Sequence, residues 1–193
     1  MSRRTTHRLA VPVGPEDHVL GNPQAKLTLV EYGDYACPYS RNAFSTTAVL
    51  QRRLGSQLRF VFRHFPVVDR DPLAQEAAEA ALAAGAQGRF WEAHERLFSG
   101  NLEALLADPG VLAKELGLDV ARFTADLRDG KFRARVAEEA DGGVKSGIHG
   151  TPTFFINGAR FAGSWELHSL LHALRLRLRT LPAEQATQGA ATL

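Results

Sequence analysis

A chain of 193 residues, 45% of them hydrophobic, suits one globular domain with an insertion and has ample apolar material for a core. Its formal net charge of only +2 excludes strong steering toward nucleic acid, and no run approaches the ~20 apolar residues that span a bilayer. We therefore expect neither a nucleic-acid nor a membrane partner. Residues 1–20 lack the apolar core of a secretory signal, and the single cysteine agrees with a reducing compartment. A cytoplasmic protein is expected, or an extracytoplasmic one if a leader has been removed; the oligomeric state stays open.

The N-terminal half of the chain is expected to form a β–α–β unit after a tail at residues 1–16. An apolar run predicts a buried strand near residues 25–31. A helix is predicted over residues 38–54, because Pro38 suits a first helical position and Gly55 suits a helix end. Alternation of apolar and basic residues predicts a second strand over 57–65. If this second strand pairs parallel to the first, with the helix as the crossover between them, the unit is expected to be right-handed.

Helices are predicted from about residue 71 to residue 147. Asp71 and Asp119 are good N-caps, and Asp108-Pro109-Gly110 interrupts the helical pattern between them. After this stretch, residues 153–156 and 160–162 flank Asn157-Gly158, which is a strong short-hairpin signal. Ser164 is expected to cap a last helix. The predicted organisation is one domain over residues 17–180, with a helical insertion at about 71–147 and a tail at 181–193.

Cys37 lies where the first strand's loop meets the predicted helix, in the run Asp34-Tyr-Ala-Cys-Pro-Tyr-Ser40. The free N–H groups and positive dipole end of a helix favour the thiolate form of a sulfur placed there. A thiolate is the nucleophile of disulfide exchange. A buried structural cysteine is the alternative, but the aromatic residues on both sides and Pro38 after it make that interpretation weaker.

A second stretch, Gly150-Thr-Pro-Thr153, stands at the start of a predicted strand. Proline cannot donate to a strand ladder, so Pro152 must lie at the strand's start or edge. The Thr151–Pro152 bond is a candidate for a cis peptide, which folded proteins use sparingly.

Together, Cys37-Pro-Tyr-Ser40 and the Thr151–Pro152 loop resemble the DsbA-like thiol–disulfide oxidoreductases of the thioredoxin-like superfamily, over roughly Asp17 to Arg179. The resemblance implies an α/β thioredoxin-like fold with a helical insertion between its βαβ and ββα halves, which agrees with the predicted elements. It also implies a cis-proline loop beside the reactive sulfur, and a buried acid that assists proton transfer, for which Glu31 has the right position. Substrate main chain would pair with Thr151 and Pro152 by adding a strand, next to Pro38 and Tyr39.

Ser40 is where the chain departs from the family's Cys-Pro-x-Cys motif, because serine stands in place of the second, resolving cysteine. Cys37 is the only cysteine, so no intramolecular disulfide forms within one chain. Three hypotheses follow. The protein is a monothiol oxidoreductase that attacks protein or glutathione disulfides and needs an external thiol for resolution. It is a dithiol oxidoreductase in which residue 40 was deliberately changed from cysteine to serine. Or it is a peptide-binding module without turnover.

The sequence gives weaker support to the other candidate residues. His149 precedes Thr151 by two positions, and a cationic imidazole there would stabilise the Cys37 thiolate. Ser40 could donate a hydrogen bond to the same thiolate. His168 and His172 stand four apart on one helix face, but with no nearby cysteine and only Glu166 as a carboxylate they are interpreted as solvated rather than metal-binding. No metal site and no cofactor are predicted.

Overall fold

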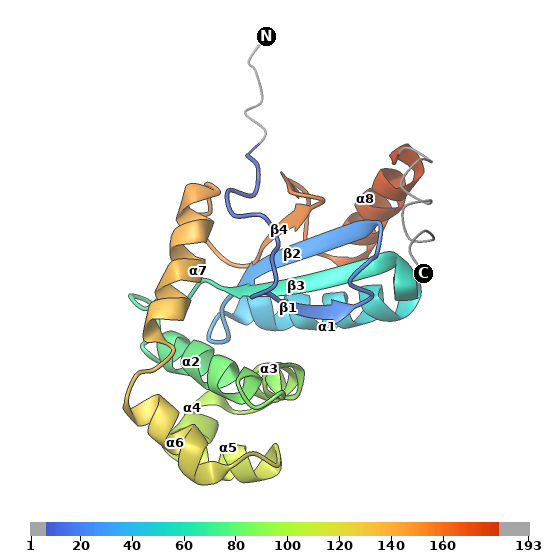
Figure 1. Ribbon diagram of the computed structural model, residues 1–193. Helices are drawn as coiled ribbons and strands as arrows, with labels where there is room; N and C mark the ends of the chain where they lie inside the picture. The colour runs from blue at the N-terminus through green and yellow to red at the C-terminus, as the bar shows by residue number, and fades with distance from the viewer. Residues whose placement is uncertain (1–6, 182–193) are drawn as a thin grey trace.

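The computed structural model describes residues 7–181 as a mixed five-stranded sheet flanked by helices (Figure 1). The strands are β1 (His18–Gly21), β2 (Leu27–Gly33), β3 (Leu58–His64), β4 (Thr153–Ile156) and β5 (Ala159–Arg160), in the spatial order β1-β3-β2-β4-β5. β2 and β3 are parallel, as the sequence predicted, and the other neighbouring pairs are antiparallel. The sheet therefore has the predicted βαβ half and ββα half.

β2 is the central strand, and all seven of its residues are buried. Leu27 and Leu29 join the larger hydrophobic cluster, whereas Val30 and Tyr32 join a smaller cluster on the opposite face of the sheet. Residues that alternate along a strand point to opposite faces, so both faces of β2 are covered. Such coverage explains why this strand reads as a continuous apolar run.

α1 (Pro38–Leu54) connects β2 to β3 and has Cys37 as its N-cap residue. A short 3₁₀ turn, η1 (Gly55–Gln57), follows it, and Gly55 has a φ of 51°, which favours glycine. α1 packs beside the last helix, α8 (Leu167–Thr180), and these two helices contact β3 and β2 respectively. This packing fixes the N-terminal end of α1 at the edge where β2 ends.

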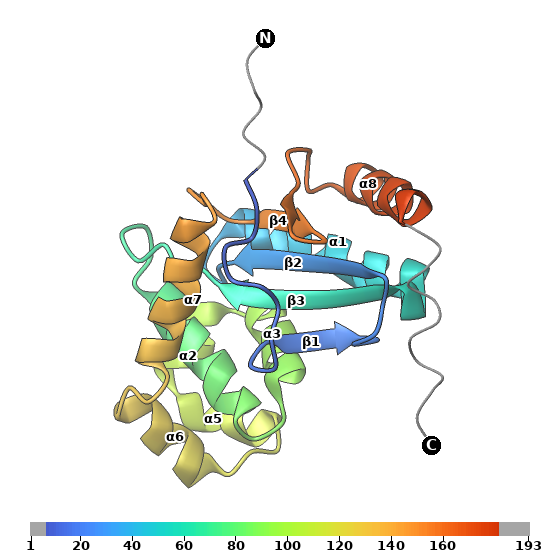
Figure 2. The same ribbon diagram turned by 45° about the horizontal axis from the view of Figure 1, so that its top comes forward.

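The insertion between β3 and β4 consists of six helices, which lie at one end of the sheet (Figures 1 and 2). Asp119 caps one of them, as predicted, by accepting a hydrogen bond from the amide of Arg122. Asp108, predicted only to interrupt the helical pattern, caps another by accepting one from the amide of Gly110. Asp71 was predicted as an N-cap, but Pro72 has that position. Among residues 7–181, no helix is both long enough and apolar enough to cross a membrane. The six helices are α2 (Leu73–Gly85), α3 (Phe90–Ser99), α4 (Leu102–Ala107), α5 (Pro109–Glu115), α6 (Val120–Arg128) and α7 (Arg133–Lys145).

Both ends of the domain differ from the expectation. The segment 17–23, for which no strand was predicted, contains strand β1, which pairs with β3. The described part of the expected N-terminal tail, residues 7–16, is bound to the sheet: Arg8 forms an isolated bridge with Ala159. At the other end, Ser164 accepts a hydrogen bond from Glu166, and Glu166 rather than Ser164 is the N-cap of α8. The expected C-terminal tail lies, beyond residue 181, outside the described residues.

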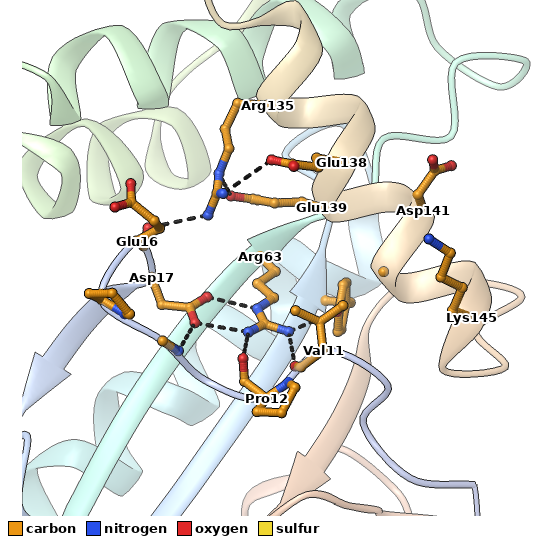
Figure 3. Close-up of a pocket in the computed structure, with 14 residues that line it drawn as sticks. Val11, Pro12, Glu16, Asp17, Arg63, Arg135, Glu138, Glu139, Asp141 and Lys145 are labelled. Atoms are coloured by element: carbon orange, nitrogen blue, oxygen red, sulfur yellow. Dashed lines mark hydrogen bonds and ion pairs between the residues drawn. The ribbon is translucent and has the colours of Figure 1, made fainter.

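Arg63 holds the N-terminal segment against β2 and β3 (Figure 3). Its guanidinium donates two hydrogen bonds to the carboxylate of Asp17, at 2.7 and 2.8 Å, and two more to the carbonyls of Val11 and Pro12. A fifth goes to the hydroxyl of Tyr32 at 3.0 Å. The buried cation is therefore fully paired, which accounts for the docking of residues 11–17 beside a cavity of about 390 Å³ that α7 closes from the other side.

Candidate active site

The strand register brings Cys37 and the Thr151–Pro152 loop together. β4 pairs antiparallel with β2, so the start of β4 lies next to the end of β2, from which the chain leads to Cys37. The Cys37 thiol is 9% exposed and donates a hydrogen bond to the carbonyl oxygen of Thr151 at 3.4 Å. The Thr151–Pro152 peptide is cis. Two motifs separated by more than a hundred residues thus form one site, as the sequence predicted.

Asp34 organises the turn that carries Cys37. Its backbone carbonyl accepts a hydrogen bond from the Cys37 amide at 3.1 Å. Its carboxylate accepts one from the Ala36 amide at 2.9 Å and one from the Val67 amide at 3.0 Å, which ties this turn to the loop after β3. Asp34 and Tyr35 are only 5% and 1% exposed, so their side chains lie beneath the surface and form no part of the rim of a substrate groove.

Ser40 is fully buried in the first turn of α1. Its hydroxyl oxygen accepts a hydrogen bond from the Asp34 amide at 3.3 Å. No hydrogen bond joins Ser40 to Cys37 in the described part of the chain, so the expected donation to the Cys37 sulfur is not made in this structure. Ser40 instead closes the same turn that Asp34 organises.

Glu31 lies within the sheet, between Phe62 of β3 and Phe154 of β4 in the strand register. It is 1% exposed, and its Oε1 has no hydrogen-bond partner among the described residues. Burial, together with the negative charge of a Cys37 thiolate, raises the pKa of Glu31 to about 8. A carboxyl group of this kind is largely protonated at neutral pH and exchanges its proton near physiological pH. The role of Glu31 in proton transfer to or from the sulfur stays a prediction.

The expected substrate-binding residues surround the sulfur on the solvent side. Pro38 is exposed, and Tyr39 exposes 58% of its surface. Thr151 and Pro152 are half-buried on the other side of Cys37. An exposed aromatic ring beside a nearly buried nucleophile leaves an open approach for an extended chain, and the assignment of these residues to substrate binding stays a prediction.

The histidines proposed from the sequence are all exposed. His149 lies before the cis peptide with its side chain in solvent, and no hydrogen bond or ion pair involving it is found within residues 7–181. Its proposed effect on Cys37 stays a prediction. His168 and His172 are exposed on α8. In the part of the chain that the structure describes, no group of three or more histidine, cysteine or carboxylate side chains could hold a metal ion.

Sequence reasoning missed a cluster of buried polar side chains beneath the site. The Tyr35 hydroxyl lies 3.0 Å from Nδ1 of His94 on α3. His64, at the end of β3, forms a 2.7 Å ion pair with Glu139 of α7. Tyr35 was visible as a residue of the cysteine loop, but its partner comes 59 positions later, and the His64–Glu139 pair spans 75 positions. No local pattern in the sequence signals either contact.

Comparison with protein families agrees with the geometry. A family model described as "Thioredoxin" matches residues 14–175. The crystal structure of a thioredoxin-like oxidoreductase from Silicibacter pomeroyi DSS-3 is similar, with a TM-score of 0.74 and 31% sequence identity over 88% of this chain and 95% of that one. BdbD from Bacillus subtilis in its oxidised form (TM-score 0.73, 24% identity, 83% and 92% covered) and α-DsbA1 from Wolbachia pipientis (0.72, 22%, 91% and 97%) share the fold.

Several curated relatives have a different name and are much longer. The Na(+)/H(+) antiporter NhaA 1 of Salinispora arenicola (strain CNS-205) is 45% identical over 167 residues, which are 86% of this chain but 26% of that protein. The Na(+)/H(+) antiporter NhaA of Herminiimonas arsenicoxydans is 40% identical over 173 residues, with 89% of this chain and 27% of that protein covered. The chain thus spans about a quarter of the length of these relatives.

Proposed function

Because this chain belongs to the thioredoxin-like superfamily and is DsbA-like, we propose that it exchanges thiols and disulfides as a monothiol enzyme, with Cys37 as its nucleophile. The Cys37 thiolate attacks one sulfur of a substrate disulfide, forms a mixed disulfide and releases the other sulfur as a thiolate. An external thiol, of a protein or of glutathione, then attacks the mixed disulfide and returns Cys37 to its reduced form. In its ionised form, a minority at neutral pH, Glu31 accepts the Cys37 proton as the thiolate forms, and the protonated carboxyl group then gives that proton to the leaving thiolate.

The single observation that carries this proposal is the position of the Cys37 sulfur. It lies at the N-terminal end of α1 and 3.4 Å from the carbonyl oxygen of Thr151, in the loop that precedes β4. The helix end favours the thiolate, and the loop offers main-chain groups to an extended substrate. Ser40 supports the monothiol form, because a hydroxyl has a far higher pKa than a thiol and does not attack a disulfide.

The mixed disulfide is the species to look for. The protein is incubated with a peptide that contains a disulfide, and its intact mass is then measured without reductant. We expect a persistent adduct on Cys37, which glutathione releases and dilution does not. The Ser40→Cys variant should instead lose the adduct quickly and gain an internal disulfide, because a Cys-x-x-Cys helix start brings two sulfurs together.

Two controls make the result decisive. The Cys37→Ser variant should form no adduct, since it lacks the only thiol. The Ser40→Ala variant should keep the adduct, which shows that the hydroxyl takes no part in resolution. If the unmodified chain forms no adduct under conditions where Ser40→Cys turns over, the monothiol mechanism is wrong.

The two alternatives predict other behaviour. If residue 40 is a changed cysteine, the Ser40→Cys variant is the working enzyme, and its turnover without an external resolving thiol should far exceed that of the present chain. If the protein is a binding module, a disulfide-free peptide should bind beside Tyr39 and Pro152 as tightly to Cys37→Ser as to the unmodified protein. The nearly buried thiol at the helix end favours exchange over mere binding.

For this chain we assign thiol–disulfide exchange rather than the ion exchange named for the longer relatives. The similar oxidoreductase structure is matched over 95% of its length, whereas the antiporters are matched over about a quarter of theirs. The substrates we propose are protein disulfides and thiols, together with glutathione disulfide. Cytoplasmic location is part of the proposal; alkylation of Cys37 in intact cells by a permeant reagent, and not by an impermeant one, would support it.

A further inference from the structure

A second cavity, of about 590 Å³, lies between α1, α3 and the β1–β3 edge of the sheet. Its walls include the aromatic rings of Phe44, Phe60 and Trp91, and neither Cys37 nor Pro152 lines it. Phe44 and Trp91 are only half-buried, so part of their apolar surface faces this space. The volume and the aromatic walls are typical of sites for small organic molecules.

Two polar side chains are buried at this cavity: Thr47, whose hydroxyl donates to the carbonyl of Phe44, and His94. His94 is 4% exposed and belongs to the cavity lining. Burial, together with the charges of His64 and His18, lowers the pKa of His94 to about 3. The imidazole is therefore neutral at neutral pH, with one ring nitrogen that donates a hydrogen bond and one that accepts.

The neighbouring phenol decides which nitrogen carries the proton. The Tyr35 hydroxyl lies 3.0 Å from Nδ1 of His94, and among the described residues it has no other partner. Burial raises the pKa of Tyr35 well above its usual value, so the phenol keeps its proton. If Nδ1 carried the imidazole proton, the Tyr35 O–H would be buried without an acceptor, which is unfavourable. Tyr35 therefore donates to Nδ1, and the His94 proton is on Nε2.

Nε2 of His94 is then a donor without a hydrogen-bond partner within residues 7–181. It is not one of the fully buried unpartnered atoms, so it keeps some access to solvent although the side chain as a whole is nine-tenths buried, and a ligand can reach it. The rim of the cavity carries Arg52 together with Glu92 and Glu95, so neither sign of charge dominates there. A neutral ligand with one acceptor fits these features better than an ion.

We propose that this cavity binds a small, neutral, planar molecule whose aromatic ring packs among Phe44, Phe60 and Trp91 and whose carbonyl oxygen accepts the Nε2–H of His94. The site is separate from Cys37 and independent of the proposed exchange reaction. Aromatic ketones and amides are the chemical class that has both features.

Acetophenone is a suitable probe, and ethylbenzene is its counterpart without an acceptor. In a ¹⁵N-labelled Trp165→Phe variant, the indole N–H of Trp91 is the one remaining tryptophan signal. Acetophenone should shift this signal saturably, with a dissociation constant on the order of 1 mM for so small a ligand. Ethylbenzene should bind the same protein roughly 3- to 10-fold more weakly than acetophenone, because it has no acceptor for the hydrogen bond. Acetophenone should bind a His94→Phe variant more weakly by the same factor, because that variant has no donor.

A second variant keeps the test clear if His94→Phe fails to fold. Ala48 lines the cavity from α1 and is half-buried, so Ala48→Phe should fill it and abolish the saturable shift. Ala140→Phe is the control, because Ala140 is half-buried on α7 and does not line the cavity. The proposal fails if acetophenone gives no saturable shift, if Ala48→Phe leaves the affinity unchanged, or if ethylbenzene binds as well as acetophenone.

Discussion

Two buried glutamates near the same end of the sheet are in opposite states. Glu31 of β2 is 1% exposed and has an oxygen without a partner, and burial raises its pKa to about 8. Glu139 of α7 is 7% exposed, and its Oε2 accepts hydrogen bonds from both the amide and Nδ1 of His64, each at 2.7 Å. Burial opposes ionisation there as well, but the charge and hydrogen bonds of His64, with a contribution from Arg135, lower the pKa of Glu139 below its usual value.

The comparison shows that pairing, rather than burial, decides what a buried carboxyl group does. Glu139 joins α7 of the insertion to β3, and its charge is fully compensated. Glu31 has no such compensation, and its charge interacts with that of Cys37. Strongly shifted pKa values cluster at functional sites, which supports the proton-transfer role proposed for Glu31.

Removing Glu139 should have the largest effect on stability. Glu139→Ala leaves the buried His64 amide and Nδ1 without their partner, which should lower the free energy of unfolding by roughly 3–5 kcal/mol in urea titrations at pH 7. Glu138→Ala is the control: the Glu138 side chain is 73% exposed, so this change should alter the free energy of unfolding by less than about 0.5 kcal/mol. At urea concentrations well below the unfolding transition, the Glu139→Ala variant should form the adduct at Cys37 as the unmodified protein does. A large loss of adduct formation in the folded variant would contradict the assignment of a structural role to Glu139 and of proton transfer to Glu31.

Removing the charge of Glu31 should change the pH dependence of stability. The folded state holds the Glu31 proton up to a pKa of about 8, whereas the unfolded chain releases it near 4.5. Between these values the folded state binds more protons, so stability falls as pH rises, by up to about 1.4 kcal/mol per pH unit. In Glu31→Gln this slope should disappear, which makes the variant the more stable protein at pH 8.

Other groups titrate in part of the same range, so the difference between the two proteins is the quantity to measure. Burial lowers the pKa of His18 to about 4 and that of His94 to about 3, and these groups make stability rise with pH up to about 6.5. Urea titrations at pH 6.5, 7.25 and 8 lie above that window. Equal slopes for the unmodified protein and Glu31→Gln would show that Glu31 is paired in solution.

The sequence predicted those elements whose ends are set by neighbouring residues, and it missed those that depend on contacts between distant residues. Pro38 and Gly55 bound a helix that runs from Pro38 to Leu54, as expected, and the cysteine and proline motifs meet as expected. Strand β1 was missed because Gly21-Asn-Pro23 reads as a turn, while its extended backbone depends on pairing with β3. The compensation of Glu139 was invisible for the same reason: its partner is 75 positions away, and only the packing of α7 on β3 brings them together.

Gly33 should be the next most sensitive position, because it gives Glu31 its space. A Cβ atom at Gly33 would overlap the ring of Phe62 and lie 3.1 Å from Oε1 of Glu31. Gly33→Ala should therefore lower the free energy of unfolding, measured in urea, by about 1–3 kcal/mol. It should also alter the dependence of that free energy on pH for which Glu31 is responsible. Gly14→Ala is the matched control, since a Cβ there meets nothing within 4 Å. An unchanged midpoint for Gly33→Ala would mean that Phe62 has room to move.

Tyr39 should show the smallest effect on stability and a clear effect on exchange. Its ring is 58% exposed, so Tyr39→Ala should change the free energy of unfolding by less than about 0.5 kcal/mol. An exposed aromatic side chain beside the nucleophile is a good contact for a peptide, so exchange with a peptide disulfide should slow roughly 3- to 10-fold. Exchange with glutathione disulfide, which has no apolar side chain to pack on the ring, should change less. Leu176→Ala on α8 is the control, because Leu176 is similarly exposed, at 54%, and is not part of the site. If both variants slow peptide exchange equally, the effect is not due to contact at the site, and Tyr39 should be removed from the substrate-binding set.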